Sequence, residues 1–165
     1  MHRIERPRQG AAATHRVANH LQGDRTMNST LSRGSVAQDL RRALQGALAP
    51  AQLDALCRLV SEASDEYPAY GQVTPCVCVR IAAPAGKTFR SEPGPCEFDG
   101  PPANGQVYTD DLDLLYRTTR NYQYTATPVY VSVVFFDDSG GVLGVFQGAA
   151  PSIISGIGGG VGSWS

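Results

Sequence analysis

The stretch TPVYVSVVFFDDSGGVLGVFQG, residues 127–148, constrains the fold more than any other part of the chain. Residues 129–136 are mostly apolar at both odd and even positions, so a strand here is apolar on both faces. The sequence DDSGG then supplies a turn, and residues 142–147 return antiparallel to the first strand. A hairpin of this kind has to be covered on both sides.

The chain ends in GVFQGAAPSIISGIGGGVGSWS, residues 144–165, which carries no charge. We predict two short strands, about 151–157 and 160–164, with glycines at the sharp corners of a narrow barrel, where other residues do not tolerate the dihedral angles or the close contacts. Trp164 is expected to seal one end of the core. Many short strands with glycine-rich corners and one short helix predict a mainly β fold, a small closed antiparallel barrel.

Two helical patterns precede the strands. Valine and leucine recur every four residues through 36–48, and residues 53–60 follow the i, i+3, i+4, i+7 pattern of one apolar face. Ser35 suits an N-cap and Pro50 the first turn of a second helix. We predict helices at about 36–48 and 50–64 that pack on their own domain, with a position on a membrane surface as the alternative.

A further helix of two to three turns is predicted within YTDDLDLLYRTTR, residues 108–120. Thr109 can cap it, and Asp110 and Asp111 stand at the positive end of its dipole. Its apolar face is expected to comprise Leu112, Leu115 and Tyr116.

Charge divides the 165-residue chain unevenly. Residues 1–34 carry six arginines and two acids, a net charge of +4, whereas the remainder is −5. The acidic body disfavours binding to nucleic acid, whose phosphates attract clustered Lys and Arg. No run approaches the ~20 apolar residues of a transmembrane helix, and no secretory signal is visible near Met1. We expect a disordered basic extension at 1–34, a helical segment at 35–66 and a barrel domain at 67–165.

The residue types that carry chemistry form no workable set. The four cysteines, at 57, 76, 78 and 96, are expected as buried reduced thiols, because all three histidines lie within residues 1–34 and zinc-type spacing is missing. Ser139 has no histidine base after His20, and Asp110, Asp111 and Asp113 point in different directions on a helix. We therefore expect no enzyme, cofactor or metal site.

The hairpin, the helix and the tail contain uncommon short sequence motifs in a fixed order. They are Gly86, Lys87, Thr88 and Phe89; Tyr108, Thr109, Asp110, Asp111 and Leu112; Leu115 and Tyr116; Phe135, Phe136 and Asp137; Leu143 and Gly144; Gly158, Gly159 and Gly160; Gly162, Ser163 and Trp164. In these motifs, residues 70–165 resemble the virulence-associated protein (Vap) family of actinobacterial intracellular pathogens.

The resemblance implies an eight-stranded antiparallel β-barrel capped at one end by a short helix, placed here at 109–118. It also implies a non-enzymatic virulence-associated role through surface interaction, with a host phagosomal or lysosomal membrane or a protein partner, by a monomer. The visible lack of a secretion signal favours a cytoplasmic or non-classically secreted protein. One alternative is an intracellular interaction module unrelated to virulence.

The other alternative is a small apolar-ligand carrier. It would require a cavity inside the barrel, although an eight-stranded barrel is filled by side chains by default. The candidate lining residues are Tyr116, Tyr122, Tyr124, Tyr130, Phe135, Phe136 and Phe146.

Overall fold

The structure is a computed structural model that describes residues 33–63, 65–74, 78–92, 102–128, 130–149 and 155–165. All of them fall in one compact unit, Leu31–Ser165. The elements are α1 (Arg33–Leu44), α2 (Pro50–Glu62), β1 (Asp65–Val73), β2 (Val79–Ala82), the 3₁₀ turn η1 (Pro84–Gly86), β3 (Thr88–Ser91), β4 (Ala103–Thr109), α3 (Leu112–Thr118), β5 (Asn121–Ala126), β6 (Tyr130–Phe136), β7 (Val142–Ala149) and β8 (Gly156–Trp164).

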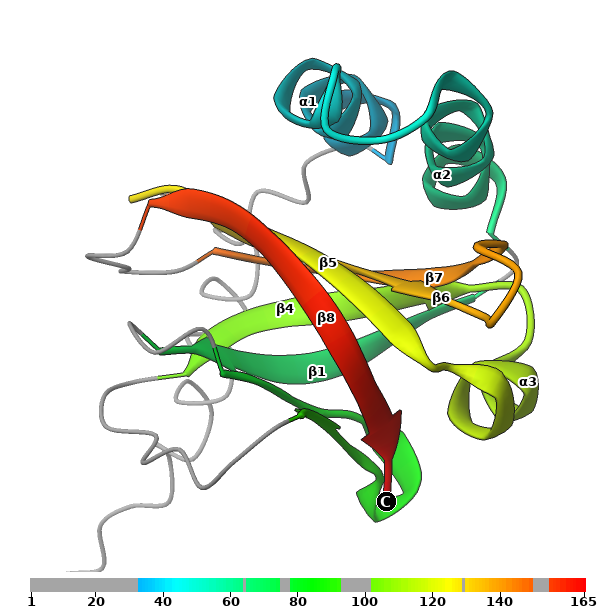
Figure 1. The fold of residues 1–165 in the computed structure, drawn as a ribbon, viewed down its shortest axis with the longest axis vertical. Helices are drawn as coiled ribbons and strands as arrows, with labels where there is room; N and C mark the ends of the chain where they lie inside the picture. Colours follow the sequence, from blue (N-terminus) through cyan, green and yellow to red (C-terminus); the bar gives the residue numbers. More distant parts are fainter. Residues whose placement is uncertain (1–32, 64, 75–77, 93–101, 129, 150–154) are drawn as a thin grey trace, which may run out of the picture. The chain divides into compact units, whose positions relative to one another are not determined.

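The eight strands form a closed antiparallel barrel in the order β1-β2-β3-β8-β5-β6-β7-β4, and β4 returns to pair with β1. The predicted hairpin is present as β6 and β7, with Val134 opposite Val145. The last strand, β8, lies between β3 and β5 and crosses the barrel as the long red arrow of Figure 1. The predicted closed eight-stranded barrel is confirmed.

Residues of alternate parity along each strand fill the barrel interior. On β6 these are Val131, Val133 and Phe135, and each is at most 2% exposed. They belong to one cluster with Phe89 of β3 and Phe146 of β7. Period-2 patterning therefore decided which side chains enter the core.

The closing glycines lie in one continuous strand rather than at corners between two strands. Gly158 and Gly162 face neighbouring rings: a Cβ on Gly158 would stand 2.6 Å from Tyr124 Cε1, and one on Gly162 would stand 2.5 Å from Phe89 Cζ. None of the glycines of β8 has a positive φ. The predicted position at corners is wrong, whereas the predicted close contacts are confirmed and are the physical reason for these glycines. Residues 151–154 of the predicted first tail strand lie outside the described residues.

The short helix α3 begins later than expected. Asp111 is its N-cap and accepts a hydrogen bond from the backbone N–H of Leu114 at 2.8 Å. Thr109 ends β4 instead, and its hydroxyl donates to the carbonyl of Leu143 at 2.8 Å. The prediction of Thr109 as the cap is therefore wrong, because β4 holds this residue in the sheet. The predicted apolar face is correct: Leu115 is fully buried in the interior cluster.

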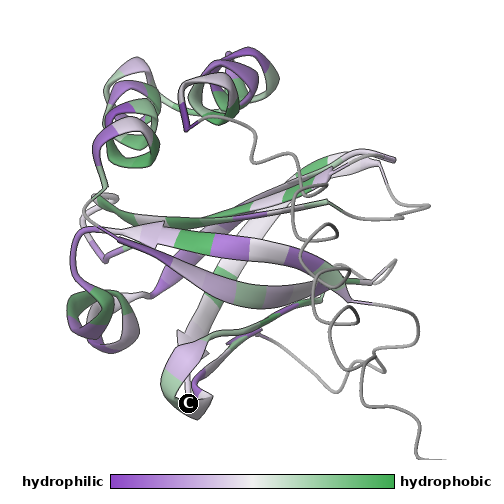
Figure 2. Cartoon of the chain, turned by 180° about the vertical axis from the view of Figure 1, so that it is seen from behind, coloured by the Kyte–Doolittle hydropathy of each residue, from purple (hydrophilic) through white to green (hydrophobic). Residues whose placement is uncertain are grey.

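The helices α1 and α2, here called the helix pair, cover part of the outer face of the barrel. Leucine, valine and alanine side chains of both helices form a second cluster with Tyr108 of β4, Val134 and Phe136 of β6 and Val145 of β7. Figure 2 shows hydrophobic stripes on the two helices and on the strands. The cover explains why the hairpin is apolar on both faces. The predicted helical segment before the barrel is confirmed, with Arg33 and Gly34 included in α1.

The described cysteines differ in state. Cys57 is a free thiol, buried in the helix pair, where its Sγ lies 3.5 Å from the carbonyl oxygen of Ala37. Burial raises the pKa of this thiol, against the smaller effect of Arg41. Cys78, by contrast, is disulfide-bonded. The prediction of reduced thiols is correct for Cys57 and wrong for Cys78, since sequence spacing does not reveal which strands bring cysteines together.

Candidate interaction surface

The aromatic members of the family signature seal one end of the barrel. Trp164 packs against Tyr116, Phe135 and Phe89 with ring centroids 4.9, 5.2 and 5.5 Å apart. Its indole N–H donates to the hydroxyl of Thr119 at 3.2 Å. The predicted sealing role of Trp164 is confirmed. The role is structural, because the indole ring packs against other aromatic rings and its N–H has a hydrogen-bond partner inside the core.

The other signature residues hold connections between strands. Gly86 has a φ of +71° at the end of the turn η1. Lys87 joins this turn to β3, which begins at Thr88. The backbone of Thr88 pairs with Ser165 beyond β8. At Gly144, a Cβ would stand 3.1 Å from Leu115 Cδ1, so the glycine makes room for the cap helix. Gly86, Thr88 and Gly144 thus shape the connections of the barrel.

Asp137 organises the turn between β6 and β7. Its Oδ1 accepts from the backbone N–H and the hydroxyl of Ser139 at 2.8 and 2.6 Å, and from the N–H of Gly141 at 2.8 Å. The hydroxyl of Ser139 and these N–H groups hold the pKa of Asp137 below its ordinary value. Ser139 is thus a turn residue, in agreement with its rejection as a nucleophile.

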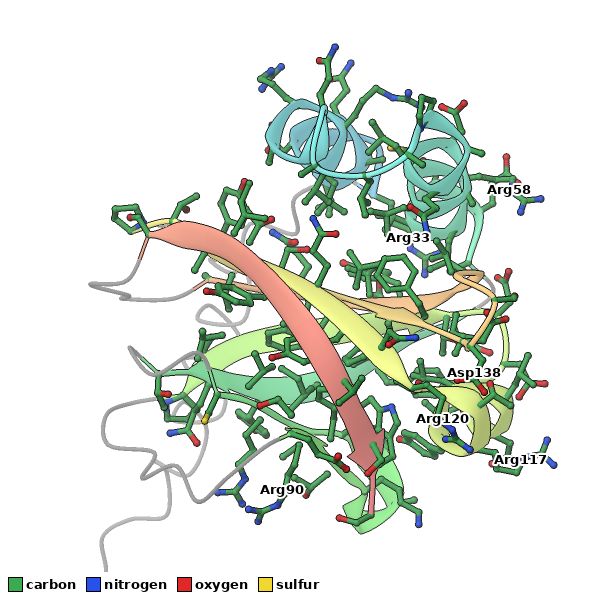
Figure 3. The ribbon with its side chains drawn as sticks, in the orientation of Figure 1. Arg33, Arg58, Arg90, Arg117, Arg120 and Asp138 are labelled. Atoms are coloured by element: carbon green, nitrogen blue, oxygen red, sulfur yellow. The ribbon has the colours of Figure 1, made fainter. Side chains whose placement is uncertain are left out.

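A surface pocket of about 380 Å³ lies beside this turn and α3; it is lined by Leu114, Thr118, Arg120, Asp137, Asp138, Ser139 and Leu143. Figure 3 shows Arg120 and Asp138 on neighbouring segments at this end of the barrel. The Arg120 guanidinium donates to the carbonyl of Thr119 at 2.9 Å, and Asp137 is engaged in its own turn. Two of the polar groups that line the pocket therefore serve local structure.

The aromatic residues considered for a cavity fall into separate places. Tyr122, Tyr124, Phe135 and Phe146 are buried together in the interior, and Tyr116 packs against them. Phe136 lies on the opposite face, beneath the helix pair. The candidate lining residues of the carrier alternative therefore do not form one set, because β6 directs adjacent phenylalanines to opposite faces of the sheet.

Few polar contacts tie the helix pair to the barrel. Gln52 of α2 donates to the carbonyl of Gly140 in the β6–β7 turn at 3.0 Å. Gln123 of β5 donates to the carbonyl of Ala47 at 3.3 Å. The guanidinium of Arg33 pairs with Glu66 at 3.3 Å, with both side chains more than a third exposed. A surface ion pair of this kind contributes little, so apolar contact provides most of the attachment.

Beneath the helix pair lies a row of polar side chains, which we call the polar row: Thr125 of β5, Ser132 of β6 and Gln147 of β7. They stand opposite one another in the sheet register, Thr125 with Ser132 and Ser132 with Gln147. Thr125 is 5% exposed and Ser132 1%. Thr125 Oγ1, Ser132 Oγ and Gln147 Oε1 are buried and have no hydrogen-bond partner within the described part of the protein.

Contacts on three sides place the polar row under the helix pair. Val134 follows Ser132 on the same face of β6 and belongs to the helix-pair cluster. On the other side of Ser132, burial and then the charge of Asp39 in α1 raise the pKa of Tyr130. Gln123, beside Thr125 on β5, contacts Ala47 between the helices. The polar row was not predicted from the sequence, although Ser132 interrupts an otherwise apolar strand.

The solvent side of the helix pair is charged. Arg41 pairs with Asp54 at 2.8 Å and Arg42 with Asp39 at 3.1 Å, in ion pairs that are at least half exposed. Arg58 points away from the barrel in Figure 3. Across the described ranges, no helix is both long and apolar enough to cross a membrane. The same ranges contain no cluster of three His, Cys, Asp or Glu side chains suited to a metal ion.

Comparison with known proteins identifies similar chains. The family model described as Rhodococcus equi virulence-associated protein matches residues 24–165. The solved structure of virulence-associated protein VapB from the intracellular pathogen Rhodococcus equi is 34% identical, with a TM-score of 0.53, over 61% of this chain and 96% of VapB. VapD from the same organism is 34% identical, with a TM-score of 0.50, over 61% of this chain and 97% of VapD. No curated protein matches significantly.

Proposed function

The chain belongs to the Rhodococcus equi virulence-associated protein family, and on that premise we propose that it acts without catalysis, by contact with a host membrane. The barrel is the scaffold and the N-terminal part is the contact. The observation that carries this proposal is the separation of charge: residues 1–62 are +4 and residues 65–165 are −5. Of this +4, residues 1–32 carry +3 and the helix pair carries +1, so an anionic bilayer attracts the part of the sequence before the barrel and repels the barrel.

The amphipathic character of the helix pair supports the same proposal. Both helices place valine and leucine on one face, and Arg41, Arg42 and Arg58 lie on the exposed side. Such a helix can lie in the interface of a bilayer with arginines near the headgroups. A phagosomal or lysosomal membrane fits the virulence-associated family.

The disulfide at Cys78 supports a site of action outside a reducing cytosol. We therefore propose that the protein works in an oxidising compartment. A protein partner on the same charged surface is the alternative mode of contact. A carrier role has no observation in its favour, because aromatic side chains crowd the interior.

Flotation of the full chain with phosphatidylcholine vesicles, with and without phosphatidylglycerol, tests the proposal. We expect binding only to the anionic vesicles, with loss of affinity as salt increases. The triple variant Arg41→Gln/Arg42→Gln/Arg58→Gln should bind at least tenfold more weakly, at about 1 kcal/mol for each arginine near the surface. Arg117→Gln, an exposed arginine of α3, is the matched control and should bind normally. Absence of binding at neutral and acidic pH would direct attention to a protein partner.

A further inference from the structure

At the interface between the helix pair and the barrel, apolar side chains are well buried, but several buried polar atoms lack a hydrogen-bond partner. Leu40, Leu44, Leu56 and Val60 are at most 1% exposed, so the apolar part is well buried. The polar row beneath the same helices leaves three buried oxygen atoms without a partner within the described protein. A buried oxygen atom without a hydrogen bond is less stable than the same atom in water, so each of the three opposes closure of the interface. The closed interface is therefore less stable than its apolar area implies.

The geometry of the attachment favours movement of the helix pair as a unit. α1 and α2 pack against each other, and Cys57 of α2 contacts the carbonyl of Ala37 in α1. Only the short link between Glu62 and Asp65 joins α2 to β1. The helix pair takes no part in the strand order of the barrel, so the pair can separate from the barrel without any loss of strand pairing.

Gln52 acts as the main polar clamp on the closed position. Its Nε2 donates to the carbonyl of Gly140 on the barrel, and its Oε1 accepts from the backbone N–H of Ala49 at 3.3 Å, at the start of α2. One side chain thus caps the helix and ties it to the β6–β7 turn. Loss of this side chain weakens the closed position directly.

We propose that the helix pair is a releasable cover, and that the apolar faces it buries against the barrel form a concealed surface for an anionic lipid bilayer. Release hydrates the polar row and exposes the valine and leucine faces of α1 and α2. The partner is a bilayer because anionic headgroups attract the basic sequence before the barrel, of which residues 1–32 carry +3 and the helix pair +1, and repel the barrel, which carries −5. The inference rests on the proposed function and adds the surface that carries it and the equilibrium that controls it.

A quantitative consequence follows from linkage. If the bilayer binds only the released form, the apparent affinity is reduced by the fraction of molecules that are released. Any substitution that changes the release equilibrium by some factor, without touching the lipid-binding faces, must therefore change lipid affinity by the same factor.

Two sets of substitutions shift the equilibrium in opposite directions. Thr125→Val with Ser132→Ala removes two unpartnered hydroxyls from beneath the cover, which stabilises the closed form. Gln52→Ala removes the clamp, which favours release. Gln45→Ala is the control for the clamp, because Gln45 lies in the connection between α1 and α2 and is exposed. Trp164, the single tryptophan, reports through its fluorescence that the barrel is folded in each variant.

The first readout is hydrogen exchange of the full chain without lipid, followed in peptides from α1 and α2. We expect about tenfold slower exchange in Thr125→Val/Ser132→Ala and about tenfold faster exchange in Gln52→Ala, with Gln45→Ala unchanged. Unchanged or faster exchange in the double variant would refute the proposal that the helix pair is a releasable cover.

The second readout is affinity for phosphatidylcholine vesicles that contain phosphatidylglycerol. We expect it to fall by the same factor in Thr125→Val/Ser132→Ala and to rise by that factor in Gln52→Ala. If exchange changes while lipid affinity does not, the concealed surface is refuted and the proposed membrane contact stands. If the unaltered protein fails to bind vesicles, the proposed membrane function is refuted. The hydrogen-exchange result then still tests whether the helix pair is released from the barrel.

Discussion

The barrel interior and the interface beneath the helix pair are both buried, but they are held together differently. In the interior, Trp164 packs among aromatic rings and its N–H is paired with Thr119. Every strand beside it is bonded to two neighbours. Beneath the helix pair, aliphatic side chains meet the outer face of β6 and β7, and the polar row has no partners within the described residues.

This difference shows that the exposed fraction of a side chain does not measure how strongly its region resists opening. Ser132 is 1% exposed and Trp164 9% exposed, yet Trp164 cannot leave the core unless strand pairing breaks. The helix pair can leave without that cost. A polar side chain that is only 1% exposed thus belongs to the region that opens more easily.

The largest expected effect separates two adjacent phenylalanines. Phe135→Ala should lower the free energy of unfolding of the barrel by about 3–5 kcal/mol, because it leaves a cavity among closely packed rings. Phe136→Ala should lower barrel stability less and should instead speed hydrogen exchange in α1 and α2. Urea unfolding followed by Trp164 fluorescence checks the first effect. Equal losses of barrel stability in the two variants would erase the distinction between the regions.

The next effect tests the close approach of strands at β8. Gly162→Ala should destabilise the barrel by about 1–3 kcal/mol, because its Cβ would stand 2.6 Å from the carbonyl oxygen of Arg90 and 2.5 Å from the Phe89 ring. Gly156→Ala is the control, since nothing lies within 4 Å of its Cβ position. Thermal unfolding of both variants measures the difference. A stable Gly162→Ala protein would contradict the account of these glycines.

A smaller effect contrasts two buried threonines. Thr119 is satisfied: its hydroxyl donates to the carbonyl of Leu115 at 2.6 Å and accepts from Trp164. Thr119→Val should therefore cost about 1–3 kcal/mol by leaving the indole N–H unpaired. Thr125→Val should cost nothing or stabilise the protein, because its hydroxyl has no partner. Urea denaturation of the two variants gives the comparison, and a destabilising Thr125→Val would mean that this hydroxyl is satisfied.

The smallest effect concerns the turn that joins the two regions through Gly140. Hydrogen bonds from Ser139 and Gly141 lower the pKa of Asp137, so its contribution to stability is present above about pH 4, its unfolded value, and is lost as pH falls through the lower folded value. Asp137→Asn should flatten the loss of stability below pH 4. Acid titration of the unfolding midpoint, compared with Asp138→Asn, checks this. Identical acid profiles for wild type and Asp137→Asn would refute the role of the carboxylate.

Local patterns were sufficient for elements whose stability is local. The leucine spacing of 36–60 predicted both helices, and the alternation through 129–136 predicted β6 with its turn and partner strand. The boundary of α3 was missed because Thr109 has equal local reason to cap a helix and to end a strand, and its bond to Leu143 decides between them. The division into separate segments at 35–66 and 67–165 stays a prediction, since the helix pair shares a cluster with the barrel.

The sequence by itself determined a barrel with a sealed end and a pair of amphipathic helices, because periodicity and residue size act over a few neighbouring positions. Only the tertiary structure decided that β8 inserts between β3 and β5, that Cys78 forms a disulfide, and that Thr125, Ser132 and Gln147 align beneath the helices. These features join residues far apart in the chain. Their energies depend on register and on what covers a face, which no local pattern specifies.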